Sequence, residues 1–459
     1  MSTAIQEVGT YLETFTAFNK SAAGTQLPWL RKLREEAFAR FCETGFPTTH
    51  DEDWRFTNVA PIVKTQFALA KQPKALAKSD LRPWLLDGSA ARLVFVDGRF
   101  VPELSDVPNL SAGVSVSSLS RQLAGKPQEV EAHLGRYVDI RRDAFCALNT
   151  AFIDDGAYIL VHRAKVLEAP IHLLFVSTAS DLATMTHPRN LLIFEDESQG
   201  TVIEEYVSIG AGSMLSNSVT ELIAGENATV SHYMIEREHR EAFNISTLRI
   251  QQARSANVSS HSLLLGGGLV RNNVHPVLAG EGGECLINGL FVGEEHQHLD
   301  NYMYVEHAKP HCSSRQFYNG ILDGHAHGVF HGRIVVHKDA QKTDAKQTNR
   351  NLLLSDDAQI DTKPQLEIYA DDVKCTHGAT IGQIEENALF YLQSRGIDEI
   401  SARRLLLLAF ASECLDRMRP GVARDHADRL IHRHLLSVAD HAPGRPSKNA
   451  RGRSWEEIG

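Results

Sequence analysis

The pattern of apolar and polar residues divides the chain into three regions. In the first region, apolar residues recur at helical spacing at Trp29, Leu30, Leu33, Ala37, Phe38 and Phe41. Gly45 and Pro47 then end the predicted helix. We therefore expect a helical N-terminal region over residues 1–80, with a compact aromatic loop at 51–59.

In the second region the pattern changes to short β runs with few helices. These runs cover residues 92–96, 157–161, 171–176, 190–194 and 365–369. A turn step built around Ala228, Ala256, Ala326 and Ala358 recurs at intervals of roughly 30–40 residues, as in a solenoid. Small residues are needed where the corners of a coil turn inward, so the pattern favours a β-helix over residues 90–380. A large β-sandwich is the alternative.

The third region is helical again and covers residues 381–440. It contains predicted helices at 385–394, 398–419 and 422–437, the second of which is capped by Asp398 and ended by Pro420. That helix is apolar on more than one face, at positions that include Leu405, Leu408 and Leu415. Its two faces are either both buried within the domain, or one of them binds a partner. The tail over residues 441–459 is rich in Pro, Gly, Arg and Ser, and we expect it to be disordered.

Composition and charge favour a soluble globular protein that does not bind nucleic acid. A hydrophobic content of 42% and a charged content of 23% are ordinary for a soluble globular protein. The net charge of -10 supplies no basic field for nucleic acid. The first twenty residues lack a secretory signal and no apolar run is long enough to span a membrane, so we expect a cytoplasmic protein. The six cysteines form no CxxC pair, which fits reduced and mostly buried thiols.

The motifs of self-sufficient enzymes are missing. The sequence has no GxxxxGK[ST] phosphate loop and no GxSxG nucleophile elbow. We therefore expect this chain to bind no nucleotide and to catalyse no hydrolysis by itself.

Two groups of residues are candidate metal or cluster ligands. The first is a histidine-rich stretch over residues 296–337, whose spacing matches no known ligand pattern, so a metal site there stays open. The second is Cys375 with His377. On an extended strand these two side chains project from the same face, about 7 Å apart along the strand. They either address one small object together or both point into the core.

The segment around this pair resembles a known family. Residues 347–380, followed by 381–383 and 389–397, are similar to the signature of the SufD family, and residues 53–58 (DWRFTN) resemble its N-terminal aromatic motif. The related SufB proteins differ in two places. They carry a cysteine near the segment equivalent to 347–350, and they have an acidic-histidine motif where this chain has 377–380. Both differences favour SufD.

The resemblance implies a mainly β fold, with a right-handed parallel β-helix between helical N-terminal and C-terminal domains. It also implies a scaffold subunit for iron-sulfur cluster assembly that pairs with SufB and binds the ATPase SufC. His377, with Cys375 beside it, would face SufB where a transient Fe-S cluster forms. The C-terminal helices, with Leu405, Leu408 and Leu415, would receive SufC.

Further expectations concern assembly and cofactors. Without SufB, two copies of this chain have the geometry to form a homodimer through the same edge. Some complexes of the family bind reduced flavin, but nothing in this sequence locates a flavin site.

Two other functions remain as alternatives. One is a β-helix carbohydrate lyase that uses Lys374 with Asp371 and Asp372 as base and metal ligands. The other is a stand-alone metal-binding protein that uses the histidine-rich stretch over residues 296–337.

Overall fold

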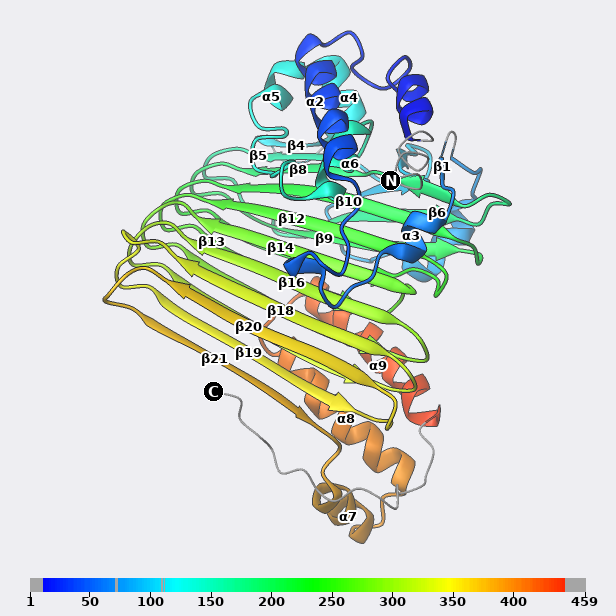
Figure 1. Cartoon of the computed structure of the whole chain (residues 1–459), viewed down its shortest axis with the longest axis vertical. Helices are drawn as coiled ribbons and strands as arrows, with labels where there is room; N and C mark the ends of the chain where they lie inside the picture. The colour runs from blue at the N-terminus through cyan, green and yellow to red at the C-terminus, as the bar shows by residue number, and fades with distance from the viewer. Residues whose placement is uncertain (1–10, 71–72, 109, 111, 442–459) are drawn as a thin grey trace.

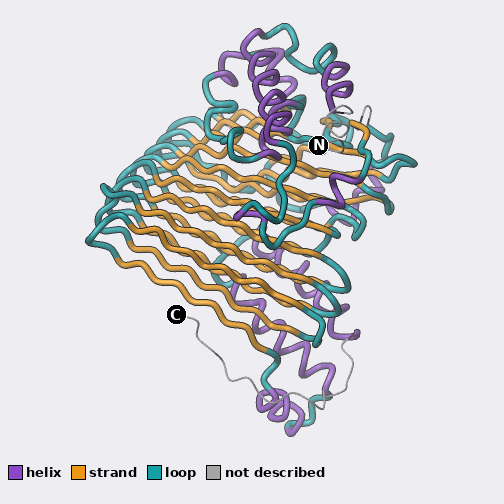
Figure 2. The backbone as a smooth tube through the Cα atoms, viewed as in Figure 1, coloured by secondary structure: helices purple, strands orange, loops and turns teal. Residues whose placement is uncertain are grey.

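The computed structural model describes residues 11–70, 73–108, 110 and 112–441. Its centre is a parallel β-solenoid of about eight coils, in which two sheets face each other across a common interior (Figures 1 and 2). The mainly β fold with a β-helix core is confirmed, and the sandwich alternative is wrong, because neighbouring strands along the stack run parallel.

From β8 onward, strands alternate between the two sheets along the chain. The 11-stranded sheet contains β1 (Ala68–Leu69), β4 (Val114–Ser118), β5 (Ala157–Val161), β7 (Thr184–Thr186), β8 (Arg189–Phe194), β10 (Met214–Ala224), β12 (Phe243–Gln252), β14 (Leu269–Leu278), β16 (His298–His307), β18 (His327–Val336) and β20 (Gln359–Ile368). The 10-stranded sheet contains β2 (Ala91–Val96), β3 (Arg99–Phe100), β6 (Ile171–Thr178), β9 (Gln199–Ile209), β11 (Thr229–Arg237), β13 (Asn257–Leu264), β15 (Glu284–Gly293), β17 (Ser313–Leu322), β19 (Asp344–Leu353) and β21 (Lys374–Gly382).

The length of a coil follows from the register. It ranges from 26 residues, between the paired Phe243 and Leu269, to 33 residues, between the paired Tyr158 and Leu191. The observed repeat therefore overlaps only the lower end of the interval of roughly 30–40 residues expected from the alanine step. Alternate side chains of each strand fill the interior with one continuous apolar cluster.

The corners explain why small residues recur. Asn227 and Ser255 adopt left-handed conformations with φ of 57° and 55°, and each is followed by a fully buried alanine, Ala228 or Ala256. The N–H of Asn227 donates to the carbonyl of Arg254 at the next corner, 3.0 Å away. Each corner thus turns a small side chain inward and uses its backbone to hold the following coil.

Helices lie at the N-terminal end and on the lateral faces. They are α2 (Pro28–Thr44), α3 (Ala60–Lys64), α4 (Leu119–Gly125), α5 (Pro127–Glu131), α6 (Ala144–Ala151), α7 (Glu386–Ser394), α8 (Glu399–Leu415) and α9 (Val422–His441), with 3-10 helices η1 (Glu52–Trp54) and η2 (Lys78–Trp84). Helices α4 to α6 interrupt a stretch in which the sequence indicated few helices. They pack with α2 at the end of the solenoid where β4 and β5 lie (Figure 1).

The C-terminal helices begin and end close to the predicted positions. Asp398 caps α8, since its carboxylate accepts a 3.0 Å hydrogen bond from the N–H of Ser401. The predicted disordered tail lies outside the described residues, apart from its first residue, His441, which ends α9. No helix in the described part of the chain is long and apolar enough to cross a bilayer.

Helix α9 is joined to the 10-stranded sheet by a buried ionic cluster. The carboxylate of Glu205 lies 3.1 Å from Nε2 of His426 on α9, 3.2 Å from Nε2 of His172 and 2.6 Å from Arg237. Burial acts to raise the pKa of Glu205, but hydrogen bonds from His172 and His426 outweigh it, so its pKa lies well below the usual range. Removing one partner from such a cluster leaves an uncompensated buried charge.

Buried neutral histidines should make the fold sensitive to acid. Burial lowers the pKa of His187 from 6.5 to about 3. Between these two pH values His187 is protonated in the unfolded chain and stays neutral in the folded chain. Stability therefore falls as the pH falls through this window, by about 1.4 kcal/mol per pH unit at most for this one group.

We expect His187→Gln to flatten the pH dependence of urea unfolding between pH 6.5 and pH 4. The exposed His50→Gln is the matched control, and an equal change in both variants would contradict the assignment to His187.

Candidate functional site

The two ends of the solenoid differ. At the N-terminal end the stack finishes with antiparallel pairs, β3 on β2 and β4 on β5. At the C-terminal end β20 and β21 have partners on one side only within the described chain. Two parallel strands thus present unpaired backbone groups, which is the usual template for pairing with another chain.

Cys375 and His377 lie on β21, at this open edge. Their register partners on β19 are Ala345 and Gln347, which are both buried inside the solenoid. Both side chains therefore share the interior face of the last coil, as the sequence predicted, while Thr376 between them is exposed. Because no further coil covers them, Cys375 and His377 are only half-buried.

The imidazole of His377 sits next to buried glutamines. Nε2 of Gln347 donates to Oε1 of Gln316 on β17, 2.7 Å away, and Gly332 on β18 faces this amide pair from the opposite sheet. Nδ1 of His377 and Oε1 of Gln347 are enclosed, and neither has a hydrogen-bond partner in the described structure. An interior row of polar groups therefore ends at His377.

The two candidate ligands, Cys375 and His377, differ in how readily each could bind a metal ion. Burial raises the pKa of the Cys375 thiol, which favours the neutral form over the metal-binding thiolate. Cys375 also packs against the apolar interior cluster. His377 is thus better suited than Cys375 to act as a ligand at this edge.

Apolar side chains are exposed around the same edge. Ile368 and Tyr369 at the end of β20 are 41% and 63% exposed, and Ile381 near the end of β21 is 39% exposed. Single exposed apolar residues are normal on protein surfaces, but these three flank unpaired strands. The edge therefore offers both backbone and apolar contacts to a partner.

The leucines proposed for partner docking lie in different environments on α8. Leu405 is 48% exposed, Leu408 is half-buried, and Leu415 is 3% exposed and packs with α9 against the 10-stranded sheet. Leu415 thus stabilises the intramolecular interface and does not belong to an accessible surface. Exposed apolar residues near Leu405 in sequence are Ile400 on α8 and Phe390 and Tyr391 on α7.

Helix α8 is tied to the sheet by polar contacts from three strands. Nδ2 of Asn288 donates to the carbonyl of Cys414 (2.8 Å), and Nδ2 of Asn319 donates to that of Phe410 (2.9 Å). Arg350 on β19 pairs with Glu413, with an Nη1 to Oε1 distance of 2.7 Å. These contacts fix the helix across β15, β17 and β19.

The N-terminal aromatic motif anchors its segment to the 11-stranded sheet. Oγ1 of Thr57 donates to Asp300 on β16 and lies 2.9 Å from Nε2 of His298. Trp54 stacks on Phe145 and on the guanidinium of Arg271, which lies 3.8 Å from its ring centre. The motif therefore holds the N-terminal segment against the 11-stranded sheet, and Trp54 and Thr57 do not lie at the open edge.

The histidine-rich stretch does not converge. Most of its members interact with a neighbour of their own, such as His327 with Asp361 and His337 with Glu306, both at 2.8 Å. His296 and His325 stack on one another at 4.8 Å. Among the described residues, no three His, Cys, Asp or Glu side chains gather into a metal site.

The residues of the lyase alternative lie on or beside the exposed turn before β21. Lys374, Asp371 and Asp372 are all exposed, and Asp372 is already paired with Lys342. Cleavage of a saccharide requires a base and its metal ligands to converge on the substrate. An ion-paired surface turn provides no such site.

The fold is a parallel β-solenoid with an open last coil, a Cys and a His on its interior face and helices on its flanks. The chain belongs to the SufBD family of iron-sulfur cluster assembly proteins. Residues 175–410 match the family model described as "SUF system FeS cluster assembly, SufBD core domain", and residues 5–173 match the SufBD protein N-terminal region.

Individual relatives agree with this assignment and with the resemblance to SufD. The chain is 33% identical to the iron-sulfur cluster assembly protein SufD of Escherichia coli, over 84% of this chain and 88% of the relative. It is also 33% identical to an iron-sulfur cluster assembly SufBD family protein of Synechocystis, over 86% and 89%. SufD of Bacillus subtilis shares 25% identity over 89% and 93%.

Sequence reasoning missed the glutamines next to His377. Gln316, Gln347 and His377 follow one another at intervals of 31 and 30 residues, which is one coil each. Aligning the strands by that repeat would have placed all three at one interior position. Neither the register nor the inward face was available from alternation within a single strand.

The contact opposite the glutamine pair is testable with one methyl group. A Cβ at Gly332 would lie 1.9 Å from Nε2 of Gln347, so the amide must move and break its hydrogen bond to Gln316. We expect Gly332→Ala to lower the free energy of unfolding by about 1–3 kcal/mol, measured by urea denaturation.

The matched control is Gly378→Ala on β21. A Cβ at Gly378 meets no atom within 4 Å, so this variant should unfold like the wild type. Equal stability of the two variants would show that the glutamine pair does not constrain the interior at this point.

Proposed function

We propose that this chain is a cytoplasmic, non-catalytic scaffold subunit that pairs with SufB and binds the ATPase SufC during iron-sulfur cluster assembly. The observation that carries the proposal is the open last coil, where His377 lies on the interior face beside an unpaired strand edge. Membership of the SufBD family gives the reaction context. ATP hydrolysis belongs to SufC in this proposal.

The number of ligands supports a shared site. An Fe-S cluster is normally held by about four ligands, most of them thiolates. This edge offers one imidazole and one thiol whose pKa is raised by burial. The remaining ligands would come from SufB, so the cluster is cargo held at the interface and not a resident cofactor of this chain.

Strand geometry supports a homologous partner. The free edges of β20 and β21 belong to two different sheets, and a second solenoid ending in the same way would cover both at once. The exposed Ile368, Tyr369 and Ile381 would then be buried. Two copies of this chain satisfy the same geometry in the absence of SufB.

The exposed apolar residues of α7 and α8 support a separate docking surface for SufC. Phe390 is 71% exposed and Tyr391 57%, on a helix that has no buried residue. Leu405 lies on the helix that Arg350 connects to β19. A partner bound there would contact helices α7 and α8, of which α7 begins four residues after β21 ends.

His377 is tested by a comparison of three neighbouring residues. We expect His377→Ala to leave SufB binding and the melting temperature nearly unchanged and to reduce Fe-S cluster formation on the reconstituted complex sharply. Cys375→Ala should reduce it less, because the neutral thiol is a weaker ligand. Thr376→Ala, between them and exposed, is the matched control and should have no effect. The measurements are cluster yield per folded complex and melting temperature.

The opposite order of effects would remove His377 from the site. If His377 is structural, the variant melts early and yet assembles clusters at the normal rate per folded molecule.

Docking of SufC is tested at Leu405. We expect Leu405→Asp to weaken binding of SufC roughly tenfold or more, because a charge then replaces an apolar contact in the interface. Leu182→Asp is the control, since Leu182 is 67% exposed and lies in the β6 to β7 connection, far along the chain. Titration calorimetry with purified SufC measures both. Unchanged affinity of the Leu405 variant would move the docking surface elsewhere.

A further inference from the structure

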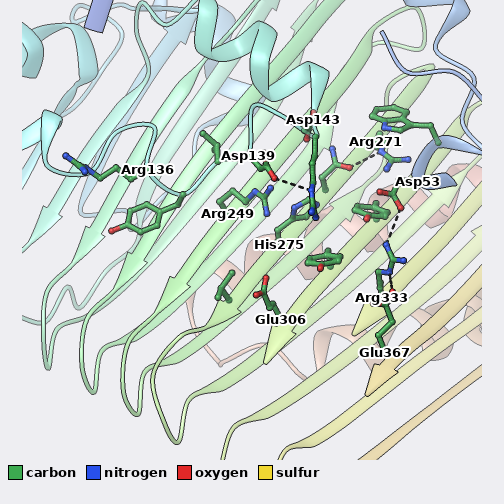
Figure 3. Close-up of a pocket in the computed structure, with 18 residues that line it drawn as sticks. Asp53, Arg136, Asp139, Asp143, Arg249, Arg271, His275, Glu306, Arg333 and Glu367 are labelled. Carbon is green, nitrogen blue, oxygen red and sulfur yellow. Dashed lines mark hydrogen bonds and ion pairs between the residues drawn. The ribbon is translucent and has the colours of Figure 1, made fainter. Parts of the chain in front are cut away.

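A cavity of about 610 Å³ lies on the outer face of the 11-stranded sheet (Figure 3). Its floor consists of outward-facing side chains of β12, β14, β16, β18 and β20. Asp53 and Trp54 of η1 form one wall, and the segment over residues 136–143 forms another. The edge strand β20 contributes Glu367 to the floor, and the C-terminal helices contribute no lining residue.

Most charged groups of the cavity are already satisfied. Arg271 bonds Asp300 and Asn273 and lies between Trp54 and Tyr302. Arg333 pairs with Glu367 at 2.6 Å and lies 3.9 Å from Asp53.

The carboxylates that are not used by these arginines have other partners. Glu306 pairs with His337 at 2.8 Å, and Asp139 pairs with Arg142 at 3.7 Å. Asp143 accepts hydrogen bonds from the N–H and the thiol of Cys146.

Two neighbouring side chains in the cavity have nitrogen atoms without a hydrogen-bond partner in the described chain. Arg249 on β12 and His275 on β14 are register partners, so their side chains lie side by side on the cavity floor. Arg249 forms no ion pair within the described chain, and its enclosed Nε has no hydrogen-bond partner there. His275 is only 8% exposed, yet neither of its ring nitrogens has a partner among the described residues.

Burial, with Arg249 and Arg271 nearby, lowers the pKa of His275 well below its usual value. The ring is therefore neutral and offers one N–H donor and one lone pair. Leaving a buried polar group unsatisfied costs about 1–3 kcal/mol, and such groups in native proteins usually have a function.

We propose that this cavity binds a small organic monoanion, a carboxylate carried on a flat ring, with the carboxylate accepting hydrogen bonds from Arg249 and from the N–H of His275. A carboxylate matches the fork of a guanidinium. The ring would lie against the aromatic floor, where Tyr302 and Tyr304 are 5.4 Å and 5.9 Å from His275 between ring centres.

The charge of the ligand follows from the charges in the cavity. Five arginines and five carboxylates line the cavity, so their formal charges cancel, but Arg249 has no ion pair and its Nε has no hydrogen-bond partner in the described chain. One negative charge on the ligand would pair with this arginine. A phosphate monoester carries about −1.5 to −2 at neutral pH. Its second charge would face Asp139, Asp143 and Glu306, which also line the cavity.

Three matched probes test the proposal on the full chain. They are benzoate, its neutral analogue benzamide, and phenyl phosphate. We expect titration calorimetry to show that benzoate binds more tightly than the other two. Arg249→Gln should weaken benzoate binding roughly tenfold or more, because hydrogen bonds to charged groups contribute strongly. His275→Phe, which keeps a ring without nitrogens, should also weaken it.

The control is Arg254→Gln, which removes an exposed arginine paired with Glu226 on a corner and should leave binding unchanged. Because Arg249 has no acceptor to lose, Arg249→Gln should melt no earlier than the wild type. No benzoate binding up to millimolar concentration, or equal binding by wild type and Arg249→Gln, would overturn the site. Tighter binding of phenyl phosphate than of benzoate would overturn its assignment to a monoanion.

Discussion

Every coil of this protein depends on the next one for its backbone hydrogen bonds. A strand in a parallel stack has donors and acceptors on both sides, and only a following strand in register satisfies the outer set. The N-terminal end meets this requirement with antiparallel strands and helices. The C-terminal end leaves it open within the described chain, and the open register position that results is the one occupied by His377. The candidate site and the surface for a partner are therefore two results of one unsatisfied strand edge.

Much of the architecture could be predicted from the chain alone, because its signals are local. Ala228 and Ala256 are small because each side chain is buried at an inward-turned corner, and Asp398 caps a helix that begins one residue later. Alternation within β21 was enough to place Cys375 and His377 on one face. Helices α4 to α6 were missed because they lie within a stretch dominated by β runs, where a short helix of five to eight residues gives little periodic signal.

The remainder depends on pairs that are distant in sequence. Gln347 adjoins His377 only after a complete coil has been closed, and Arg350 meets Glu413 across 63 residues. Leu415 was assigned to partner docking for the same reason, since an apolar helix face looks alike whether a sheet or another protein covers it. The cavity at Arg249 and His275 could not be predicted from the sequence, because its lining comes from five strands and two segments that precede them in the chain.

The ion pair between Arg350 and Glu413 determines how force would travel through the molecule. Arg350 is the register partner of Thr380 on β21, three residues beyond His377, so the strand that holds α8 is also the one that supports the last strand. A load applied to α8 would reach the terminal coil through Arg350 on β19, and it would reach β15 and β17 through Asn288 and Asn319. The last three strands of the 10-stranded sheet before β21 are thus coupled to one helix, which connects the terminal coil mechanically to the two coils before it.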